Sequence, residues 1–248
     1  MQRSPNTLLL IGATSDIGRA TAQCYAEAGW RVALAARNEA EARRAGDDIA
    51  ARTGVEVATH RLDVLEADGF SGFLDALPAL PDTVVCVVGE LGDQSRGQSD
   101  PAHARLILRT NFEGPALLLG LVAERFHARG SGTIVGVSSV AGDRGRGSNY
   151  LYGAAKAGFT AFLSGLRNRL APAGVRVVTV KPGFVRTRMT AGMKLPPVLT
   201  AETKEVGQAI FAAAEKGGSD VIYVRRIWRV VMMVIRSIPE RIFKRLRL

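Results

Sequence analysis

Tyr152 and Lys156 are the pair in this sequence whose types and spacing point most directly to chemistry. On a helix, residues four apart lie one turn apart on the same face. An ammonium close to a phenol favours the phenolate, so it should lower the phenol pKa from its usual value of about 10 and prepare the group for proton transfer near neutral pH. Ser139 follows an apolar run upstream of this pair. Its hydroxyl would hold a carbonyl oxygen within reach of the phenol.

A second candidate site is the turn that follows the apolar run at residues 7–11. Glycines permit a tight turn and let the backbone approach a pyrophosphate, which the positive end of the following helix would stabilise. Asp16 is placed to cap that helix, but it also puts a carboxylate where phosphates would bind. A strand–glycine–helix turn has purely structural uses as well. The candidate cofactor-binding residues here are Gly12, Thr14, Ser15, Asp16, Ile17 and Gly18.

The ends of the next two apolar runs bear on which dinucleotide would bind. An acid at the end of the second run would bind the ribose hydroxyls of NAD. That run instead ends in Ala35 and Ala36, with Arg37 next, which leaves room and charge for the 2′-phosphate of NADP. A solvent-exposed arginine without a ligand would appear the same in the sequence, so both NADP(H) and NAD(H) remain candidate cofactors. Asp63, after the third run, is placed to reach the adenine or to cap the following helix.

These candidate residues stand at the ends of predicted strands. Nearly continuous apolar runs are typical of strands buried on both faces of a parallel sheet, and here they alternate with helix-length segments. The alternation predicts an α/β fold, a Rossmann-type doubly wound sheet of about seven strands with helices on both faces. The predicted strands are 7–11, 31–36, 55–60, 83–88, 132–137, 175–180 and 220–224, and the predicted helices are 17–28, 39–53, 101–129, 152–171 and 202–216.

The composition of the 248 residues, 47% hydrophobic and 23% charged, excludes a disordered, collagen-like or coiled-coil chain. The two cysteines and three histidines lack metal-ligand spacing, so no metal site is predicted. No apolar run reaches the roughly 18 residues that a membrane span needs, and the N-terminal stretch lacks a signal-peptide layout. One catalytic domain, residues 1–224, in the cytoplasm is therefore predicted.

Residues 225–248 carry eight basic residues and one acid, Glu240, and so +7 of the formal charge of +10. On a helical wheel, one arc is apolar and arginines lie opposite, which suits the interface of an anionic membrane. Nucleic acid is the less favoured polyanion. Docking on the domain or in an oligomer interface would give the same pattern. The apolar arc is Ile227, Val230, Val231, Val234, Ile235 and Ile238, with Met232 and Met233 on the basic side.

Taken together, these motifs resemble the short-chain dehydrogenase/reductase family over about residues 7–224. The motifs are Gly12-x-x-x-x-x-Gly18, Asp63, Asn111, Ser139, Tyr152-x-x-x-Lys156 and Pro182-Gly183-x-Val185-x-Thr187. The resemblance implies a nicotinamide cofactor, a homo-oligomer, and Tyr152 as general acid toward a ketone. It also implies that Lys156 binds the nicotinamide ribose and lowers the tyrosine pKa, that Ser139 orients the substrate oxygen, and that Asn111 supports a proton-relay water.

The resemblance extends the cofactor site and contains one departure. It adds Gly89, Lys156, Pro182, Gly183, Val185 and Thr187 to the cofactor-binding residues, with Thr187 contacting the carboxamide. After the fourth strand, where the family has Asn-Asn-Ala-Gly, this sequence has Cys86-Val87-Val88-Gly89. Gly89 preserves the backbone space, but the asparagine that ties the strands together is missing.

Arginines near the predicted site bear on the substrate. Arg144 and Arg146 lie between Ser139 and Tyr152, and Arg188 follows Thr187. Guanidinium groups bind phosphate bidentately, so these arginines favour a phosphate-bearing substrate, with solvated loop arginines as the alternative.

Within the family, the chain is similar to one group, the ketoreductase subunits of decaprenylphosphoryl-ribose 2′-epimerases. The matching stretches are Asp143-Arg144-x-Arg146, Tyr152-Gly153-x-x-Lys156-Ala157-Gly158, Pro182-Gly183-x-Val185-Arg186-Thr187-Arg188-Met189 and Val231-Met232-Met233-Val234-x-Arg236-x-Ile238-Pro239. This similarity implies reduction of a polyprenylphosphoryl 2-keto-pentofuranose, a lipid-linked sugar phosphate, to the arabinose epimer. It also implies NADH as the reductant and a flavin oxidase partner subunit that supplies the ketone.

Two other functions stay open. One is a soluble reductase of another carbonyl, with a tail that is merely structural. The other is a cofactor-binding scaffold with little catalysis, which Asp16 and the missing Asn-Asn pair motivate.

Overall fold

The computed structural model describes residues 5–246, so Arg247 lies outside the described residues. Its centre is a parallel seven-stranded sheet in the order β3-β2-β1-β4-β5-β6-β9, which confirms the predicted doubly wound fold. Every second residue of a strand faces the same side of the sheet, and Leu8, Leu9 and Leu10 are all fully buried because both sides are covered. The strands are β1 Thr7–Ile11, β2 Arg31–Ala36, β3 Val57–Arg61, β4 Thr83–Cys86, β5 Gly132–Val137, β6 Val175–Pro182 and β9 Val221–Val224.

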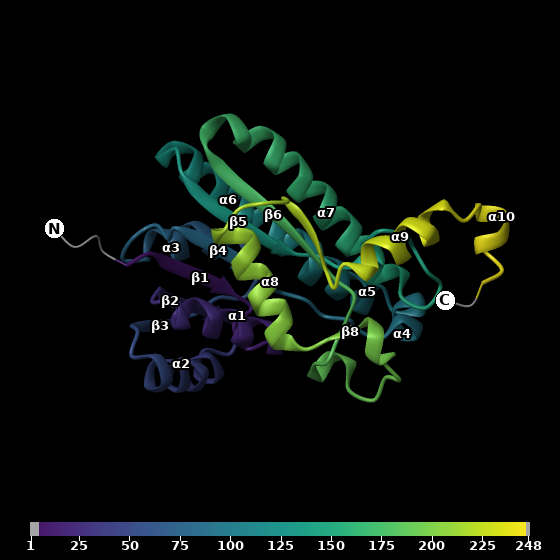
Figure 1. Cartoon of the computed structure of the whole chain (residues 1–248), viewed down its shortest axis with the longest axis horizontal. Helices are drawn as coiled ribbons and strands as arrows, with labels where there is room; N and C mark the ends of the chain where they lie inside the picture. Colours follow the sequence, from purple (N-terminus) through teal and green to yellow (C-terminus); the bar gives the residue numbers. More distant parts are fainter. Residues whose placement is uncertain (1–4, 247–248) are drawn as a thin grey trace.

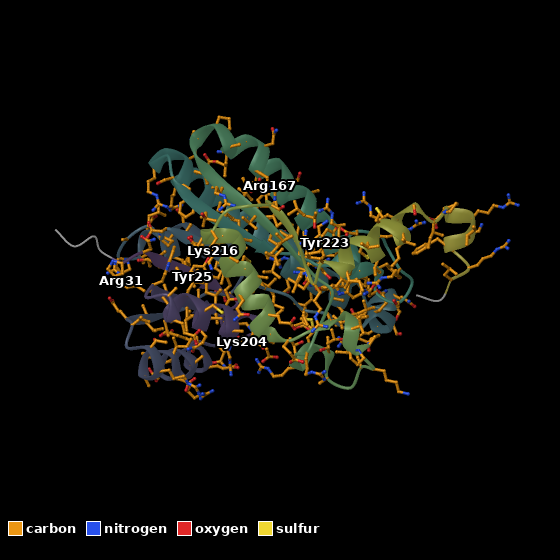
Figure 2. The ribbon with its side chains drawn as sticks, viewed as in Figure 1. Tyr25, Arg31, Arg167, Lys204, Lys216 and Tyr223 are labelled. Atoms are coloured by element: carbon orange, nitrogen blue, oxygen red, sulfur yellow. The ribbon has the colours of Figure 1, made fainter. Side chains whose placement is uncertain are left out.

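Two layers of helices cover the sheet (Figure 1). On one face, α1 (Asp16–Glu27), α2 (Glu39–Thr53) and α8 (Thr203–Glu215) pack against the side of β1 that carries Leu8 and Leu10. On the other face, α3 (Phe70–Asp75), α6 (Gly114–Arg129) and α7 (Tyr150–Leu170) pack against Leu9 and Ile11. Tyr25, labelled in Figure 2, joins α1 to α8 through a 2.8 Å hydrogen bond from its hydroxyl to Glu215.

The strand order reverses between β1 and β4. From β1 the chain proceeds outward to β2 and β3, then returns to β4 on the other side of β1. In such sheets, ligands bind in the crevice beyond the carboxyl ends of the strands at this point. The segments after the strands are α4 (Gln94–Ser99), α5 (Pro101–Leu108), the π-helical turn η2 (Arg109–Glu113), the 3-10 turns η1 (Ala67–Gly69), η3 (Val140–Gly142), η5 (Arg188–Thr190) and η6 (Pro197–Leu199), and the strand pair β7 (Phe184–Val185) and β8 (Thr200–Ala201). One further 3-10 turn, η4 (Ala171–Ala173), joins α7 to β6.

One helical stretch differs from the prediction. The helix predicted at 101–129 consists of α5, η2 and α6, so a π-helical turn interrupts it. Contrary to the prediction that no segment qualifies, Pro101–Arg129 is long and apolar enough to cross a membrane by length and composition alone. Its 18-residue window is 44% buried inside the structure, and Leu118, Val122 and Phe126 lie in the core. A core helix passes the same test, so this stretch is only weak support for a span.

The C-terminal segment forms α9 (Ile227–Ser237) and α10 (Glu240–Phe243), at the end of the molecule opposite the N-terminus (Figure 1). Trp228 and Met232 are buried against Val140. The helical wheel placed Met232 on the basic side of the helix, and its buried position shows that this placement was wrong. The Trp228 indole lies directly over Gly183, and its Nε1 donates a 2.9 Å hydrogen bond to the Leu199 carbonyl. Part of α9 therefore docks on the domain, whereas Ile227, Val230 and Val234 remain exposed.

Replacing Trp228 tests this docking. Trp228→Ala should lower the free energy of unfolding by about 3–5 kcal/mol, because it removes a buried aromatic side chain and leaves a cavity over Gly183. The matched control on the same helix is Val230→Ala, whose side chain is 56% exposed and should cost less than about 0.5 kcal/mol. Urea denaturation measures both, and equal losses for the two variants would contradict the docking.

Candidate active site

Tyr152 and Ser139 meet at the end of β5. Ser139 follows the strand and caps η3, where its Oγ accepts a 3.1 Å hydrogen bond from the Ala141 N–H. Tyr152 lies in the first turn of α7 and hydrogen-bonds to Ser139. Burial of the phenol raises the pKa of Tyr152 to about 12, and the bond to Ser139 lowers it only in part. The predicted lowering is therefore wrong in direction for the protein alone, since desolvation of the phenol is the largest influence on its pKa. The phenol is protonated at neutral pH.

Lys156 lies one turn further along α7 and is only 2% exposed. Its Nζ donates to the carbonyls of Val88 at 3.0 Å and Val137 at 3.1 Å, just beyond β4 and at the last residue of β5. The ammonium is 5.8 Å from the centre of the Tyr152 ring. Burial lowers the pKa of Lys156 to about 8, so the group is mostly charged at neutral pH. A cation thus lies close to the phenol, as the spacing predicts.

Asn111 occupies the π-helical turn η2 and is fully buried. Its Nδ2 donates to the carbonyls of Glu90 at 2.7 Å and Ile107 at 2.8 Å, and its Oδ1 accepts a 3.1 Å bond from the Glu90 N–H. π-Helical turns occur frequently at functional sites. Here the side chain fixes the backbone after β4, beside Gly89.

Gly89 and Ser138 complete the surroundings of Lys156. A Cβ at Gly89 would lie 3.4 Å from Asn111 Oδ1 and 3.6 Å from Lys156 Nζ, so this position lies between them. Ser138 Oγ donates to the Lys156 carbonyl at 2.9 Å and lies 2.7 Å from Thr160 Oγ1, which fixes α7 to the end of β5. Ser138 is not among the residues predicted from the sequence, although its place beside Ser139 at a strand end was a signal. Val87 and Val88 depart from the family's pattern, but the Val88 carbonyl still accepts a hydrogen bond from Lys156.

The glycine turn after β1 has the geometry of a dinucleotide cradle. Gly12 has a φ of +88°, and a Cβ there would lie 3.1 Å from the Val88 N atom, so a side chain is disfavoured. At Gly18 a Cβ would lie 2.6 Å from the Gly12 carbonyl oxygen. Ser15, not Asp16, is the N-cap of α1, because its Oγ accepts the Gly18 N–H at 3.0 Å. Asp16 occupies the first helical position instead.

Three cavities of about 480, 490 and 100 Å³ share lining residues and run from this turn to the tyrosine. Asp63 lies at the far end, where its carboxylate also accepts the Leu65 N–H at 3.0 Å. The glycines at the wall and the first N–H groups of α1 fit the pyrophosphate of a nicotinamide dinucleotide. The other predicted residues on the cavity walls are Thr14, Ser15, Ile17, Arg37, Gly89, Pro182, Gly183, Val185 and Thr187.

Two of the three arginines predicted at the substrate have other partners. Arg144 binds the C-terminal segment: its guanidinium donates to the carbonyls of Ile235 at 2.9 Å and Ile238 at 2.6 Å, pairs with Glu240 at 2.8 Å, and lies 3.8 Å above the Phe243 ring. Sequence position alone did not reveal this contact, because the partners are more than 90 residues away.

Arg188 turns toward the glycine turn, where it pairs with Asp16 at 3.1 Å and Glu41 at 3.4 Å. Arg146 is half-buried, and its Nε atom is buried without a hydrogen-bond partner among residues 5–246. Burial lowers the pKa of Arg146. Of the three, Arg146 is the one with a buried side-chain nitrogen that lacks a hydrogen-bond partner within residues 5–246.

A Ser–Tyr–Lys group at one end of a cleft that begins at a glycine turn is typical of a nicotinamide-dependent oxidoreductase. The profile described as short chain dehydrogenase matches residues 6–196, and the chain belongs to this family. It is therefore an NAD(P)(H)-dependent enzyme, and the scaffold alternative is set aside.

The chain is also similar to individual oxidoreductases, in sequence and in fold. An uncharacterized oxidoreductase of Streptomyces coelicolor is 36% identical over 245 residues, which cover 98% of this chain and 96% of that protein. One of Mycobacterium tuberculosis is 34% identical over 242 residues, with 96% of each covered. The fold is similar to that of a short-chain dehydrogenase from Sphingobium yanoikuyae in complex with NADPH, with a TM-score of 0.81 at 23% identity and coverage of 95% and 97%.

The unusual protonation of Lys156 can be measured without a substrate. In the protein with ¹³C-labelled lysines, one side-chain resonance should titrate with a midpoint near pH 8, because burial disfavours the charged form. The ammonium is then present below this pH and lost above it. Nuclear magnetic resonance from pH 6 to 11 makes the measurement, and Lys156→Met identifies the signal by removing it. If every lysine titrated above pH 10, the buried environment described here would be wrong.

Proposed function

We propose that this oxidoreductase reduces a ketone and that Tyr152 is its proton donor. The supporting observation is the protonated phenol, which is hydrogen-bonded to Ser139 and backed by the Lys156 cation at one end of the cleft. A bound nicotinamide dinucleotide supplies the hydride. Ser139 orients the carbonyl oxygen, and Tyr152 transfers its hydroxyl proton to that oxygen as negative charge develops there. The Lys156 ammonium stabilises the phenolate left behind.

The remaining site residues have supporting roles in this proposal. Asn111 holds the backbone at Glu90 and Gly89, which fixes the wall of the cleft next to Lys156. A relay water beside Asn111 would return a proton through Lys156 to the tyrosine. Thr187 and the Pro182-Gly183 turn line the same cavity as Tyr152, where they would contact the nicotinamide end of the cofactor.

For the substrate, we propose a polyprenylphosphoryl 2-keto-pentofuranose, reduced to the arabinose epimer. This choice is motivated by the resemblance of four short stretches to ketoreductase subunits of epimerases, and by a half-buried arginine, Arg146, with an unengaged Nε between Ser139 and Tyr152. A flavin oxidase would then be the partner that supplies the ketone. Arg37 is exposed on the wall of the adenosine end of the cleft, where it suits a 2′-phosphate, and NADP(H) and NAD(H) remain the two cofactors of the proposal.

The proposed chemistry and substrate are tested together by a turnover assay. The protein should oxidise NADPH or NADH when supplied with the keto-pentose lipid, and Tyr152→Phe should lower the rate by about 10²–10⁴-fold because the proton donor is lost. Tyr150→Phe, at an exposed tyrosine on the same helix, is the matched control and should keep the rate. Full activity of Tyr152→Phe would falsify the assignment of the proton donor.

We further propose that α9 and α10 attach the enzyme peripherally to an anionic membrane on the cytoplasmic side. Ile227, Val230 and Val234 are 41%, 56% and 54% exposed on the face of α9 that points away from the domain. Exposed cations accompany them, and each cation near an anionic surface contributes about 1 kcal/mol. These cations are Arg226, Arg229, Arg236, Arg241, Lys244 and Arg245.

Vesicle binding tests the membrane proposal. The protein should sediment with vesicles of phosphatidylglycerol and phosphatidylcholine and not with phosphatidylcholine alone. Val230→Asp combined with Val234→Asp should reduce binding at least tenfold, since both side chains are exposed and the fold does not depend on them. Val198→Asp, at a 69% exposed residue outside the segment, is the control. Unchanged binding of the double variant would contradict this attachment.

A soluble reductase of another carbonyl is the second candidate. The observation in its favour is the docking of Trp228 and Met232, which gives the C-terminal segment a structural role without any membrane. Turnover of small water-soluble ketones, together with no turnover of the keto-pentose lipid, would select this function. We also propose a homo-oligomer, because the helices α5 to α6 expose Leu108, Phe112 and Leu117.

A further inference from the structure

Asp16 and Arg188 form an ion pair across the opening of the cofactor cleft. The Arg188 side chain donates from Nε to Asp16 Oδ1 at 3.1 Å, and its backbone N–H donates to Asp16 Oδ2 at 2.7 Å. The guanidinium also contacts the Thr14 carbonyl and the Glu41 carboxylate. The two residues are 172 positions apart in the sequence, and both line the cavity beside the glycine turn.

The carboxylate of Asp16 creates an electrostatic problem at this place. It occupies the first position of α1, where the unpaired N–H groups and the positive end of the helix favour a bound anion. An uncompensated negative charge there would repel the cofactor pyrophosphate. Asp16 is only 25% exposed, so water screens this charge less than at an open surface.

Arg188 is held in place to cancel that charge. Thr187 and Thr190 bracket it in a reciprocal capping arrangement, with the Thr187 N–H bound to Thr190 Oγ1 at 3.1 Å. Thr190 Oγ1 in turn donates to the Val185 carbonyl at 2.7 Å, which ties the turn to β7. The backbone bond from Arg188 to Asp16 is formed whatever the side chain, so the segment should stay near α1 when the guanidinium is removed.

We propose that Arg188 is a positioning residue for the cofactor, which acts by neutralising Asp16 at the phosphate-binding turn. It does not contact the ketone, and the proposal is independent of the substrate. Glu41, the other acid near the cleft, already pairs with Arg19 at 2.6 Å, so Asp16 is the acid that depends most on Arg188. Without Arg188, phosphate binding would compete with an adjacent bare carboxylate.

A double-mutant cycle read by cofactor binding tests this proposal. The dissociation constants of NADPH and NADH are measured by the fluorescence of the reduced nicotinamide in the full-length protein, with no substrate present. Arg188→Met should weaken the binding of each cofactor at least tenfold. Asp16→Asn should bind at least as tightly as the parent, and the double variant should return to within about threefold of it. Arg188→Lys, which preserves the charge, should lose less than Arg188→Met.

The control is Arg186→Met, on the same segment, because Arg186 is exposed and pairs with Glu202 at 2.9 Å, away from the cleft. It should leave both dissociation constants unchanged. Thermal melting of each variant shows whether it is folded. Unchanged binding by Arg188→Met overturns the proposal. So does a double variant as weak as Arg188→Met, since the arginine would then bind the cofactor itself instead of compensating Asp16.

Discussion

The site depends on a lysine ammonium held inside the protein. Removing a charge from water is costly unless hydrogen bonds replace the lost hydration. For Lys156 these bonds come from the carbonyls of Val88, just beyond β4, and Val137, the last residue of the adjacent parallel strand β5, so the sheet and its exit provide them. Because both of these partners are neutral, the positive charge is not cancelled by them. In the proposed reaction it is available to stabilise negative charge on the Tyr152 oxygen when the proton leaves.

The fold could be predicted from the sequence, and so could the proximity of side chains that lie on the same helix. Continuous apolar runs with helical segments between them permit few arrangements, and Tyr152 and Lys156 are related by the repeat of one helix. The sequence was not sufficient for the protonation state of Tyr152, because that depends on how deeply the folded protein buries the phenol. Nor did it show the π-helical turn that turns Asn111 inward, since the surrounding helix has an ordinary apolar pattern.

Contacts between distant loops were also beyond the sequence. Arg144 and Arg188 have the residue type and the location expected of phosphate ligands, yet each finds its partners more than 90 residues away. The position of a loop follows from how the helices and strands that it joins pack together. The hydrophobic periodicity of the sequence does not specify that packing. The cap of α1 shows the same limit at short range: both Ser15 and Asp16 suit the role, and backbone geometry selects Ser15.

The C-terminal segment contacts the residues that follow Ser139 and those around Gly183, and this changes how its amphipathic pattern is understood. Asp143 lies just after the turn that Ser139 caps, where it binds Lys181 at 2.5 Å and Tyr223 at 2.7 Å, the tyrosine labelled in Figure 2. The next residue, Arg144, holds α9 and α10. Beside Gly183, Trp228 covers the glycine and donates a hydrogen bond to the Leu199 carbonyl.

Docking on the domain and attachment to a membrane are therefore not exclusive alternatives for α9. The helix carries two apolar faces, and different residues serve each. Trp228 and Met232 face the domain, whereas Val230 and Val234 face away from it among the arginines. A surface that engaged the second face would leave the first undisturbed, so the loops beside Ser139 and Thr187 would stay in place while the enzyme was attached.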